Sequence, residues 1–476
     1  MKMSERQRTH PFGIVDSFIK NIRMIINALL PTIIILLGTD MGRRWLLPAS
    51  GAILLLYSIY SIAWWYRYVY YIEDDELRLE YGLLARKKRY IPLERIQNVQ
   101  LSENVLQRLL GLTGVKVETA GGSAKAEADL YSLRREQARQ LRQLLQAGHS
   151  TGDTHPEQQP DYPEYRLLGR DLLLAAASSS RVLLIFSGLF ALVSQIEQLF
   201  PNRDIGGVME KYMYNMLDLG WLIVILLGLA ALLAAWLLAF ISEVMQWANF
   251  RLVVEGDRIL ISRGLLTRRQ IALPRRRIQA VQIMENIIQQ PLGLCRLKVI
   301  MAGSSTGNAE ASVLYPLLRR SELTEFLQVT VPELAISAMT VKPIPRRAAT
   351  RYFVVLLLPI SLMLAVWCLL VPHGYYALVL LPLFIWLAYR QYKDAGWQLE
   401  GNRLLLRRRR VTLITTLLAR RRLQSLDCSQ SILQKRTNLS AIKAAVAFGN
   451  SGTQIKLVGI GIENSHGLQK WYREQG

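Results

Sequence analysis

The sequence Ile91-Pro92-Leu93-Glu94-Arg95-Ile96-Gln97-Asn98-Val99-Gln100 is the clearest of several motifs that recur along this chain. Its last nine residues return 182 positions later as Pro274-Arg275-Arg276-Arg277-Ile278-Gln279-Ala280-Val281-Gln282. A further shift of 145 positions places Ile278-Gln279 on Leu423-Gln424. Such repeats indicate one supersecondary unit that is used several times. The sequence therefore predicts three copies of one module.

Short apolar runs on both sides of the motif predict antiparallel strands. Asp74-Asp75, Gly256-Asp257 and Gly401-Asn402 lie at the centre of the first strand pair of each copy. These pairs predict two-residue hairpin turns, because Gly, Asn and Asp tolerate a positive φ. A glycine and an apolar pair then follow in the first two copies, as Gly82-Leu83-Leu84 and Gly264-Leu265-Leu266.

Two kinds of helix are expected within the module. A short helix is predicted at residues 105–110 and 287–292, and leucines at helical spacing predict a closing helix at residues 133–145 and, similarly, 321–328. The expected module is a small curved sheet or barrel whose open mouth is covered by the closing helix. The third copy matches less well, since Ala419 replaces the proline and Asn438 replaces a glycine. A ligand site shared by the first two copies is therefore in doubt in the third.

Long apolar blocks precede each module. A membrane span needs about 20 mostly apolar residues, and six candidates form three pairs; for the shorter ones a buried or interfacial helix is the alternative. The fold class predicted is an α+β membrane protein with three transmembrane helical hairpins that alternate with the modules. The spans are residues 24–39, 45–66, 182–196 (extended by 172–180 across Arg181), 219–242, and two within the 38 uncharged residues 352–389.

Charge indicates the orientation of these spans. The chain of 476 residues has 58 Lys and Arg against 36 Asp and Glu, a net charge of +22, and is 51% hydrophobic. This composition excludes a disordered chain, a collagen-like repeat and a simple soluble enzyme. Nearly all cations lie outside the connections within the hairpins, so the positive-inside rule places both termini and all modules in the cytoplasm. Aromatic residues at span ends are expected as interfacial anchors: Trp64, Trp65, Tyr66, Tyr68, Trp247, Tyr389 and Tyr392.

Two spans before a strand-rich module with the Ile-Pro-Leu-x-x-Ile-Gln-x-Val-Gln core resemble the bacterial membrane-flanked domain family, also described as bacterial PH-like. Three copies resemble the long member of that family. The resemblance covers nearly the whole chain and implies PH-like barrels in a bacterial plasma membrane, with no known reaction. It also implies a short single-copy protein of the same family as a partner.

No motif supports catalysis or a metal. Three cysteines and five histidines are scattered without ligand spacing. Gly303-Ser304-Ser305-Thr306-Gly307 has the letters of a hydrolase nucleophile elbow, but a strand rather than a helix is expected after it. We therefore predict no catalytic residue, no metal ligand and no cofactor, and expect Ser305→Ala to leave function unchanged.

Basic runs are the distinctive polar feature of each module. They comprise Arg86, Lys87, Lys88, Arg89 and Arg95; Arg268, Arg269, Arg275, Arg276 and Arg277; and Arg420, Arg421 and Arg422. A topology signal with a solvated strand edge, contact with anionic lipid headgroups, and a protein partner are the open interpretations. Nucleic acid is disfavoured because no stacking aromatics are interleaved. In the second copy we expect the two arginine groups to flank a strand at residues 270–274 and to face the membrane together.

These observations define the expected organisation. The first hairpin occupies residues 1–66, the second 167–246 and the third 351–390; the modules occupy 67–150, 247–331 and 391–476. Proline-containing flexible linkers are expected at 151–166 and 332–350. The function predicted is a non-enzymatic scaffold of the bacterial envelope that binds a membrane surface or a protein. The alternative is a subunit of a membrane transporter or export complex, which the scarcity of ionisable residues within the spans disfavours.

Overall fold

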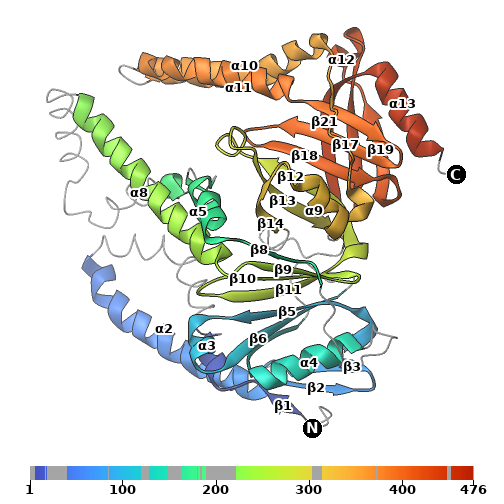
Figure 1. Cartoon of the computed structure of the whole chain (residues 1–476). Helices are drawn as coiled ribbons and strands as arrows, with labels where there is room; N and C mark the ends of the chain where they lie inside the picture. The colour runs from blue at the N-terminus through green and yellow to red at the C-terminus, as the bar shows by residue number, and fades with distance from the viewer. Residues whose placement is uncertain are drawn as a thin grey trace.

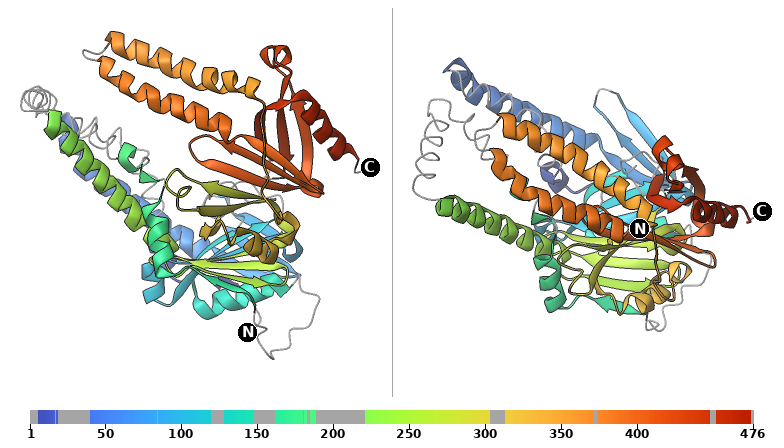
Figure 2. Two further views of the ribbon diagram at one scale, coloured as in Figure 1. Left: turned by 45° about the horizontal axis from the view of Figure 1, so that its top comes forward. Right: turned by 90° about the horizontal axis from the view of Figure 1, so that it is seen from above.

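A computed structural model describes most of the chain. The described residues are 6–16, 18, 40–83, 85–119, 128–147, 162–179, 181–182, 185–188, 221–302, 313–370, 374–447 and 452–474. The protein is an α+β molecule with antiparallel sheets and long apolar helices that leave the sheets on one side (Figures 1 and 2). The predicted span at residues 24–39 lies outside the described residues.

Each module has three strands, a one-turn 3-10 helix, three more strands and a closing α-helix. Module 1 has β2 (Val69–Glu73), β3 (Glu76–Tyr81), β4 (Lys87–Pro92), η1 (Leu93–Arg95), β5 (Ile96–Glu103), β6 (Leu112–Thr119), β7 (Ala128–Arg134) and α4 (Arg135–Ala147). Module 2 has β9 (Arg251–Glu255), β10 (Arg258–Arg263), β11 (Arg268–Pro274), η2 (Arg275–Arg277), β12 (Ile278–Glu285), β13 (Leu294–Met301), β14 (Val313–Arg319) and α9 (Leu323–Thr330). Module 3 has β16 (Gly396–Glu400), β17 (Arg403–Arg409), β18 (Leu413–Ala419), η6 (Arg420–Arg422), β19 (Leu423–Ser429), β20 (Leu439–Val446), β21 (Thr453–Gly461) and α13 (Ile462–Arg473).

The predicted hairpin turns are confirmed in all three modules. Glu73 pairs with Glu76, Glu255 with Arg258 and Glu400 with Arg403, which leaves two residues in each turn. The φ angles of Asp74, Asp75, Gly256 and Gly401 are all positive. The residue at the start of each 3-10 helix donates its backbone N–H to a turn carbonyl in every copy: Leu93 to Asp75, Arg275 to Asp257 and Arg420 to Asn402.

Asn438 explains why the third copy tolerates the loss of a glycine. Its φ is +52°, and the equivalent residues Gly111 and Gly293 have φ values of +66° and +63°. Asparagine is among the few residues that enter this left-handed region at low cost. The predicted short helix exists in module 1 as α3 (Val105–Leu109). Module 3 has an equivalent helix that was not predicted, α12 (Ile432–Arg436). In module 2 the prediction was wrong, since residues 287–293 form turns.

The sheets cross the boundaries between modules. β5 of module 1 pairs with β11 of module 2, which creates a seven-stranded sheet in the order β7-β6-β5-β11-β10-β9-β8. β12 of module 2 pairs with β18 of module 3 in a second seven-stranded sheet, ordered β14-β13-β12-β18-β17-β16-β15. Neighbouring modules are therefore joined by backbone hydrogen bonds within shared sheets.

The segments predicted as flexible linkers contribute strands instead. β8 (Glu164–Arg166) pairs with β9, and β15 (Lys342–Pro343) pairs with β16. β1 (Gln7–Arg8) has the same role beside β2. Between modules 2 and 3, Leu334, Ile336 and Ile344 are buried. The flexible-linker expectation was wrong for these parts, because proline-containing segments can dock as short edge strands that need few ladder hydrogen bonds.

Long apolar helices run into the first strand of each module. They are α2 (Asp40–Arg67), α8 (Trp221–Trp247) and, as a packed pair, α10 (Ala349–Leu370) with η5 (Gly374–Leu380) and α11 (Leu381–Lys393). Two described segments are long and apolar enough to cross a membrane, Gly228–Trp247 and Arg346–Leu370. α5 (Gly169–Ala177) ends before Arg181, so the predicted extension of a span across that arginine was wrong.

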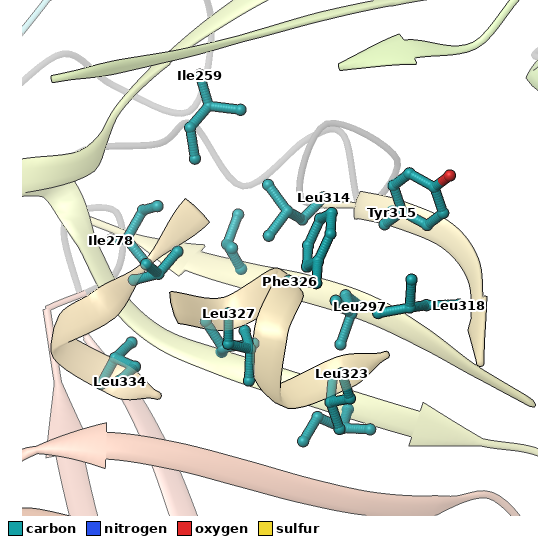
Figure 3. Packing of buried hydrophobic residues seen from close by; sticks show 14 of the residues in the cluster. Ile259, Ile278, Leu297, Leu314, Tyr315, Leu318, Leu323, Phe326, Leu327 and Leu334 are labelled. Carbon is teal, nitrogen blue, oxygen red and sulfur yellow. The ribbon is translucent and has the colours of Figure 1, made fainter. Parts of the chain in front are cut away.

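The module cores are apolar and extend across a boundary. In module 2, residues such as Leu297, Phe326 and Leu327 interdigitate between the sheet and α9 (Figure 3). Leu405 and Leu417 of module 3 belong to the same cluster. Trp247 and Tyr68 are also buried in module cores, at 1% and 6% exposure, so their predicted role as interfacial anchors was wrong.

Candidate functional site

Each module has two ends that differ in their distance from the apolar helices. At the end where α2, α8 or α11 joins the first strand, here called the helix end, lie the loops after β3, β10 and β17. Tyr81 pairs with Lys87, and Arg263 with Arg269, on either side of two of these loops. At the other end, here called the hairpin end, lie the two-residue turns and the 3-10 helices.

The thirteen predicted basic residues divide between these ends. Six lie at or toward the helix end: Arg86, Lys87, Lys88, Arg89, Arg268 and Arg269. Seven lie at the hairpin end, in or beside the 3-10 helices: Arg95, Arg275, Arg276, Arg277, Arg420, Arg421 and Arg422. A seven-residue strand separates the two groups by roughly 20 Å, at about 3.3 Å per residue.

The expectation that both arginine groups of module 2 face one surface was therefore wrong. β11 begins at Arg268 rather than after it, and Arg275–Arg277 form a helical turn at the opposite end of the strand. Strand alternation, on which the prediction relied, does not apply to residues in a 3-10 turn.

Two arginines of the hairpin end join module 3 to module 2. Arg421 and Arg422 both form ion pairs with Glu333, which lies between modules 2 and 3. Arg422 Nη1 also donates to the carbonyl of Arg276 at 2.7 Å. Arg276 Nε lies 3.0 Å from Asp257 Oδ2. The charges of these three arginines are therefore used in contacts within the protein.

At the helix end of module 1, one buried acid offsets the basic run. Glu80 is 5% exposed, pairs with Arg86, and lies 3.9 Å from both Lys88 and Arg6. Burial alone raises the pKa of this carboxyl, but the hydrogen bond and charge of Arg86, with Tyr71 and Arg6, lower it overall. The local positive charge is thus partly neutralised.

The helix end of module 2 contains a hollow of about 270 Å³. Among the described residues, none of those that line it carries a carboxylate. Its walls come from the end of α8, the loop between β10 and β11, and Arg181, and consist of Arg181, Ser242, Met245, Gln246, Arg263, Leu266, Thr267 and Arg269. Three guanidinium groups and five neutral polar or apolar side chains thus meet beside an apolar helix.

A glycine shapes the loop that forms one wall. Gly264 has a φ of +106°, and a Cβ atom there would lie 2.0 Å from the carbonyl oxygen of Thr267. The backbone N–H groups of Gly264 and Leu265 donate to Ala248 and Met245 at 2.8 and 2.9 Å, which fastens the loop to the end of α8. Leu265 and Leu266 remain 46% and 43% exposed beside that helix.

Two arginines of the hollow, Arg263 and Arg181, contact buried side chains of α8. The Arg263 guanidinium lies 4.3 Å from the ring centroid of Trp247, although Arg263 is only 3% exposed. Glu243, which is fully buried on α8, lies 3.2 Å from Arg181 and forms a second ion pair with Arg296. Burial lowers the pKa of Lys298, and the charges of Arg296 and Arg181 lower it further.

Sequence reasoning identified Arg269 but missed the other two arginines. Arg181 was considered only as an interruption of a span, and Arg263 was not assigned a role. The repeated Gly-Leu-Leu motif was the available signal, since it marks the loop that joins the module to its helix. In module 3 Arg409 occupies the position of Gly264 and donates to Asp394, so the arrangement differs there.

A positively charged hollow of this kind suits an anionic group. Guanidinium groups bind phosphate oxygens in a fixed fork geometry, and exposed leucines beside them suit an apolar neighbour. Among the described residues no group of three or more His, Cys, Asp or Glu side chains could hold a metal ion. Burial raises the pKa of the Cys295 thiol to about 12. The Gly303–Gly307 motif lies outside the described residues.

Comparison with known proteins agrees with the repeated architecture. The profile of the bacterial PH domain matches three times, at residues 25–149, 214–330 and 347–476. The chain is also 29% identical over 492 aligned positions to the UPF0699 transmembrane protein YdbT of Bacillus subtilis (strain 168), with 99% of this chain and 98% of that protein covered. No solved structure matches. The three matches cover most of the chain and confirm the resemblance seen in the sequence: the protein is a membrane protein that belongs to the bacterial PH domain family.

Proposed function

We propose that this protein is a multi-pass scaffold of the bacterial plasma membrane, with three helical hairpins and three cytoplasmic modules, and that it acts by binding rather than by catalysis. Its ligand at the helix end of module 2 is an anionic lipid headgroup. The paired helices α10 and α11 support the hairpin arrangement for the third module. The excess of cations outside the hairpin connections supports a cytoplasmic position of the modules.

The single observation that carries this proposal is the placement of the arginine-lined hollow. It lies between the end of a membrane-length apolar helix and a loop that exposes two leucines. A headgroup phosphate there can reach the guanidinium groups while its acyl chains lie along the apolar helix. A cytosolic anion would gain nothing from the neighbouring leucines.

The energetics require only a weak site. A cation near an anionic leaflet contributes about 1 kcal/mol. Because Glu243 neutralises Arg181, we count only Arg263 and Arg269, which together contribute on the order of 2 kcal/mol. Alone this corresponds to a millimolar or weaker Kd. Tethering by α8 keeps the module at the surface, where the effective lipid concentration is high, and weak contact suffices.

Lipid retention by the full-length protein tests the proposal. The protein is purified in mild detergent, mixed with equal amounts of phosphatidylglycerol and phosphatidylcholine, and examined by native mass spectrometry. Arg269→Gln removes a cation of the hollow, and Arg276→Gln is the matched control, because Arg276 is an exposed arginine of the same module at the hairpin end.

We expect the unaltered protein and Arg276→Gln to retain several-fold more phosphatidylglycerol than phosphatidylcholine, with the preference falling as salt rises. Arg269→Gln should lose most of this preference. Equal loss in both variants, or no preference in the unaltered protein, would refute a headgroup site at this position.

A further inference from the structure

The two junctions between modules follow one rule. At the first, β11 pairs antiparallel with β5, and Arg268 lies opposite Glu103. At the second, β18 pairs antiparallel with β12, and Leu413 lies opposite Glu285. The repeat shifts of 182 and 145 convert the first pair into the second, so the register is identical. In each case the fourth strand of one module joins the third strand of the next.

This rule leaves one unused edge at each end of the repeat. In the part of the chain that the structure describes, β4 of module 1 has β3 as its only ladder neighbour, and β19 of module 3 has only β20. β4 is equivalent to β11 and β18, and β19 is equivalent to β5 and β12. Modules 1 and 3 lie at opposite ends of the molecule, so the two edges of one chain do not meet (Figure 1).

We propose that β4 of one copy of this protein adds to β19 of a second copy, which extends the same sheet from chain to chain. The shared register gives the pairing of the residues. Applied to the contact between two copies, this register places Arg89 of one copy opposite Asp427 of the other, and Lys88 opposite Cys428. A head-to-tail contact of this type forms rings or open filaments rather than a closed dimer.

Charge agrees with this pairing. β4 contributes Lys87, Lys88 and Arg89, whereas the only ionisable acid on β19 is Asp427, opposite the arginine. Opposite charges facing each other across an antiparallel pair are favourable. The partner is a second copy of this chain. Strands equivalent to β4 and β19 pair with each other at both internal junctions, so the two free edges of this protein match.

The competing interpretation is that lysines on β4 keep the edge unpaired, as edge charges do in many sheets. The internal junction argues against it. In β11, Arg268 and Arg269 are equivalent to Arg86 and Lys87 of module 1, and both are paired with β5. Basic residues at these positions are therefore compatible with a ladder.

Disulfide trapping tests the proposal in the full-length protein within native membranes. Residues opposite each other in an antiparallel pair have Cα atoms about 4.5–5.5 Å apart, which is suitable for a disulfide. Lys88→Cys is combined with native Cys428 in a Cys368→Ser background, so that the cysteine on α10 does not contribute. Lys87→Cys in the same background is the register control, because neighbouring strand residues face opposite sides of a sheet.

Mild oxidation of the Lys88→Cys protein should give a ladder of covalent oligomers that disappears on reduction and when Cys428→Ser is added. Lys87→Cys should give at least several-fold less. Absence of Cys428-dependent oligomers, equal trapping by the Lys87→Cys control, or trapping only of a different, smaller protein would overturn the proposal.

Charge reversal gives an independent readout. Arg89→Asp or Asp427→Arg alone should reduce trapping several-fold in the Lys88→Cys background, since like charges then face each other. The two reversals together should restore it. If the double reversal traps no better than the single ones, the inferred register is wrong.

Discussion

Arg268 lies directly opposite Glu103 in the ladder that joins module 2 to module 1. Glu103 is held from its own module by Thr113 Oγ1 at 2.9 Å and by Arg135 Nη2 at 3.2 Å. The junction thus places an acid from one module against a cation from the next. At the second junction Leu413 occupies the equivalent position, so the charge pair distinguishes the first junction from the second.

We predict that Glu103→Arg weakens this junction and that adding Arg268→Glu partly restores it. Cross-strand charge pairs contribute about 0.2–1 kcal/mol, so the effect on the unfolding temperature will be small but reproducible. Thermal unfolding of the detergent-solubilised protein measures it. Glu136→Arg, at a side chain that is 80% exposed on α4, is the control. Strict additivity of the two substitutions would show that the residues do not interact.

We predict that Glu243→Gln destabilises the protein strongly. Glu243 is fully buried and neutralises both Arg181 and Arg296, so its loss leaves two cations with no compensating acid from α8. Removing one partner of such a buried group costs about 3–5 kcal/mol. The measurement is the midpoint of thermal unfolding, with Glu94→Gln on the exposed turn η1 as control. Equal midpoints for the two variants would contradict the assigned role.

We predict an acid-sensitive contribution from Glu80. Because the folded-state pKa of this carboxyl is lowered, its stabilisation is fully present above the ordinary glutamate value of about 4.3. It is lost as pH falls through the lowered folded value. Glu80→Gln should therefore lower the unfolding temperature at pH 7 and differ progressively less from the unaltered protein toward pH 3. A difference that is constant with pH would exclude this contribution.

We predict that Gly264→Ala is far more damaging than Gly256→Ala. Both glycines have a positive φ, but a Cβ at Gly264 would collide with the Thr267 carbonyl, whereas nothing lies within 4 Å of one at Gly256. Gly256→Ala should cost about 1 kcal/mol, and Gly264→Ala at least about 2 kcal/mol together with loss of the phosphatidylglycerol preference. Retention of that preference in folded Gly264→Ala protein would separate the loop from the lipid site.

We predict that single cysteines at Thr340 and Gly476 are protected from a membrane-impermeant maleimide in intact cells, while one at Gly207 is labelled. The reason is the three-hairpin topology, which returns the chain to the cytoplasm before each module. Labelling after permeabilisation confirms that the protected cysteines are reactive. External labelling at Thr340 would require an odd number of preceding spans and would contradict the topology.

The local structure of the modules was predictable because it depends on residues close in sequence. Asp74-Asp75 and its counterparts specify two-residue turns through their tolerance of a positive φ. At Asn438 the third copy keeps the same backbone conformation as the other two copies, although the glycine is lost. Short apolar runs bounded by turn residues predicted the strands, and leucine spacing predicted the closing helices of modules 1 and 2.

The pairing between modules was not predictable from one sequence. The side chains of β5 and β11 do not distinguish an edge strand from a paired one, since Arg268-Arg269 resembles a solvated edge in sequence. Trp247 is buried, but its sequence position beside a span also suits an interfacial anchor. An indole ring with one N–H group fits either a module core or the membrane interface. The hollow was equally hidden, since Arg181 and Arg269 are brought together by tertiary packing.

The shared sheets also bear on how such a chain changes its length in evolution. Each hydrogen-bonded sheet combines the second half of one repeat with the first half of the next, so a cut at a repeat boundary exposes two fresh edges. Gain or loss of one whole repeat leaves every internal strand with an equivalent neighbour. Copy number can therefore change by whole units while the backbone pairing of every junction is kept, and side chains such as Arg268 and Leu413 need to adapt to their new neighbours.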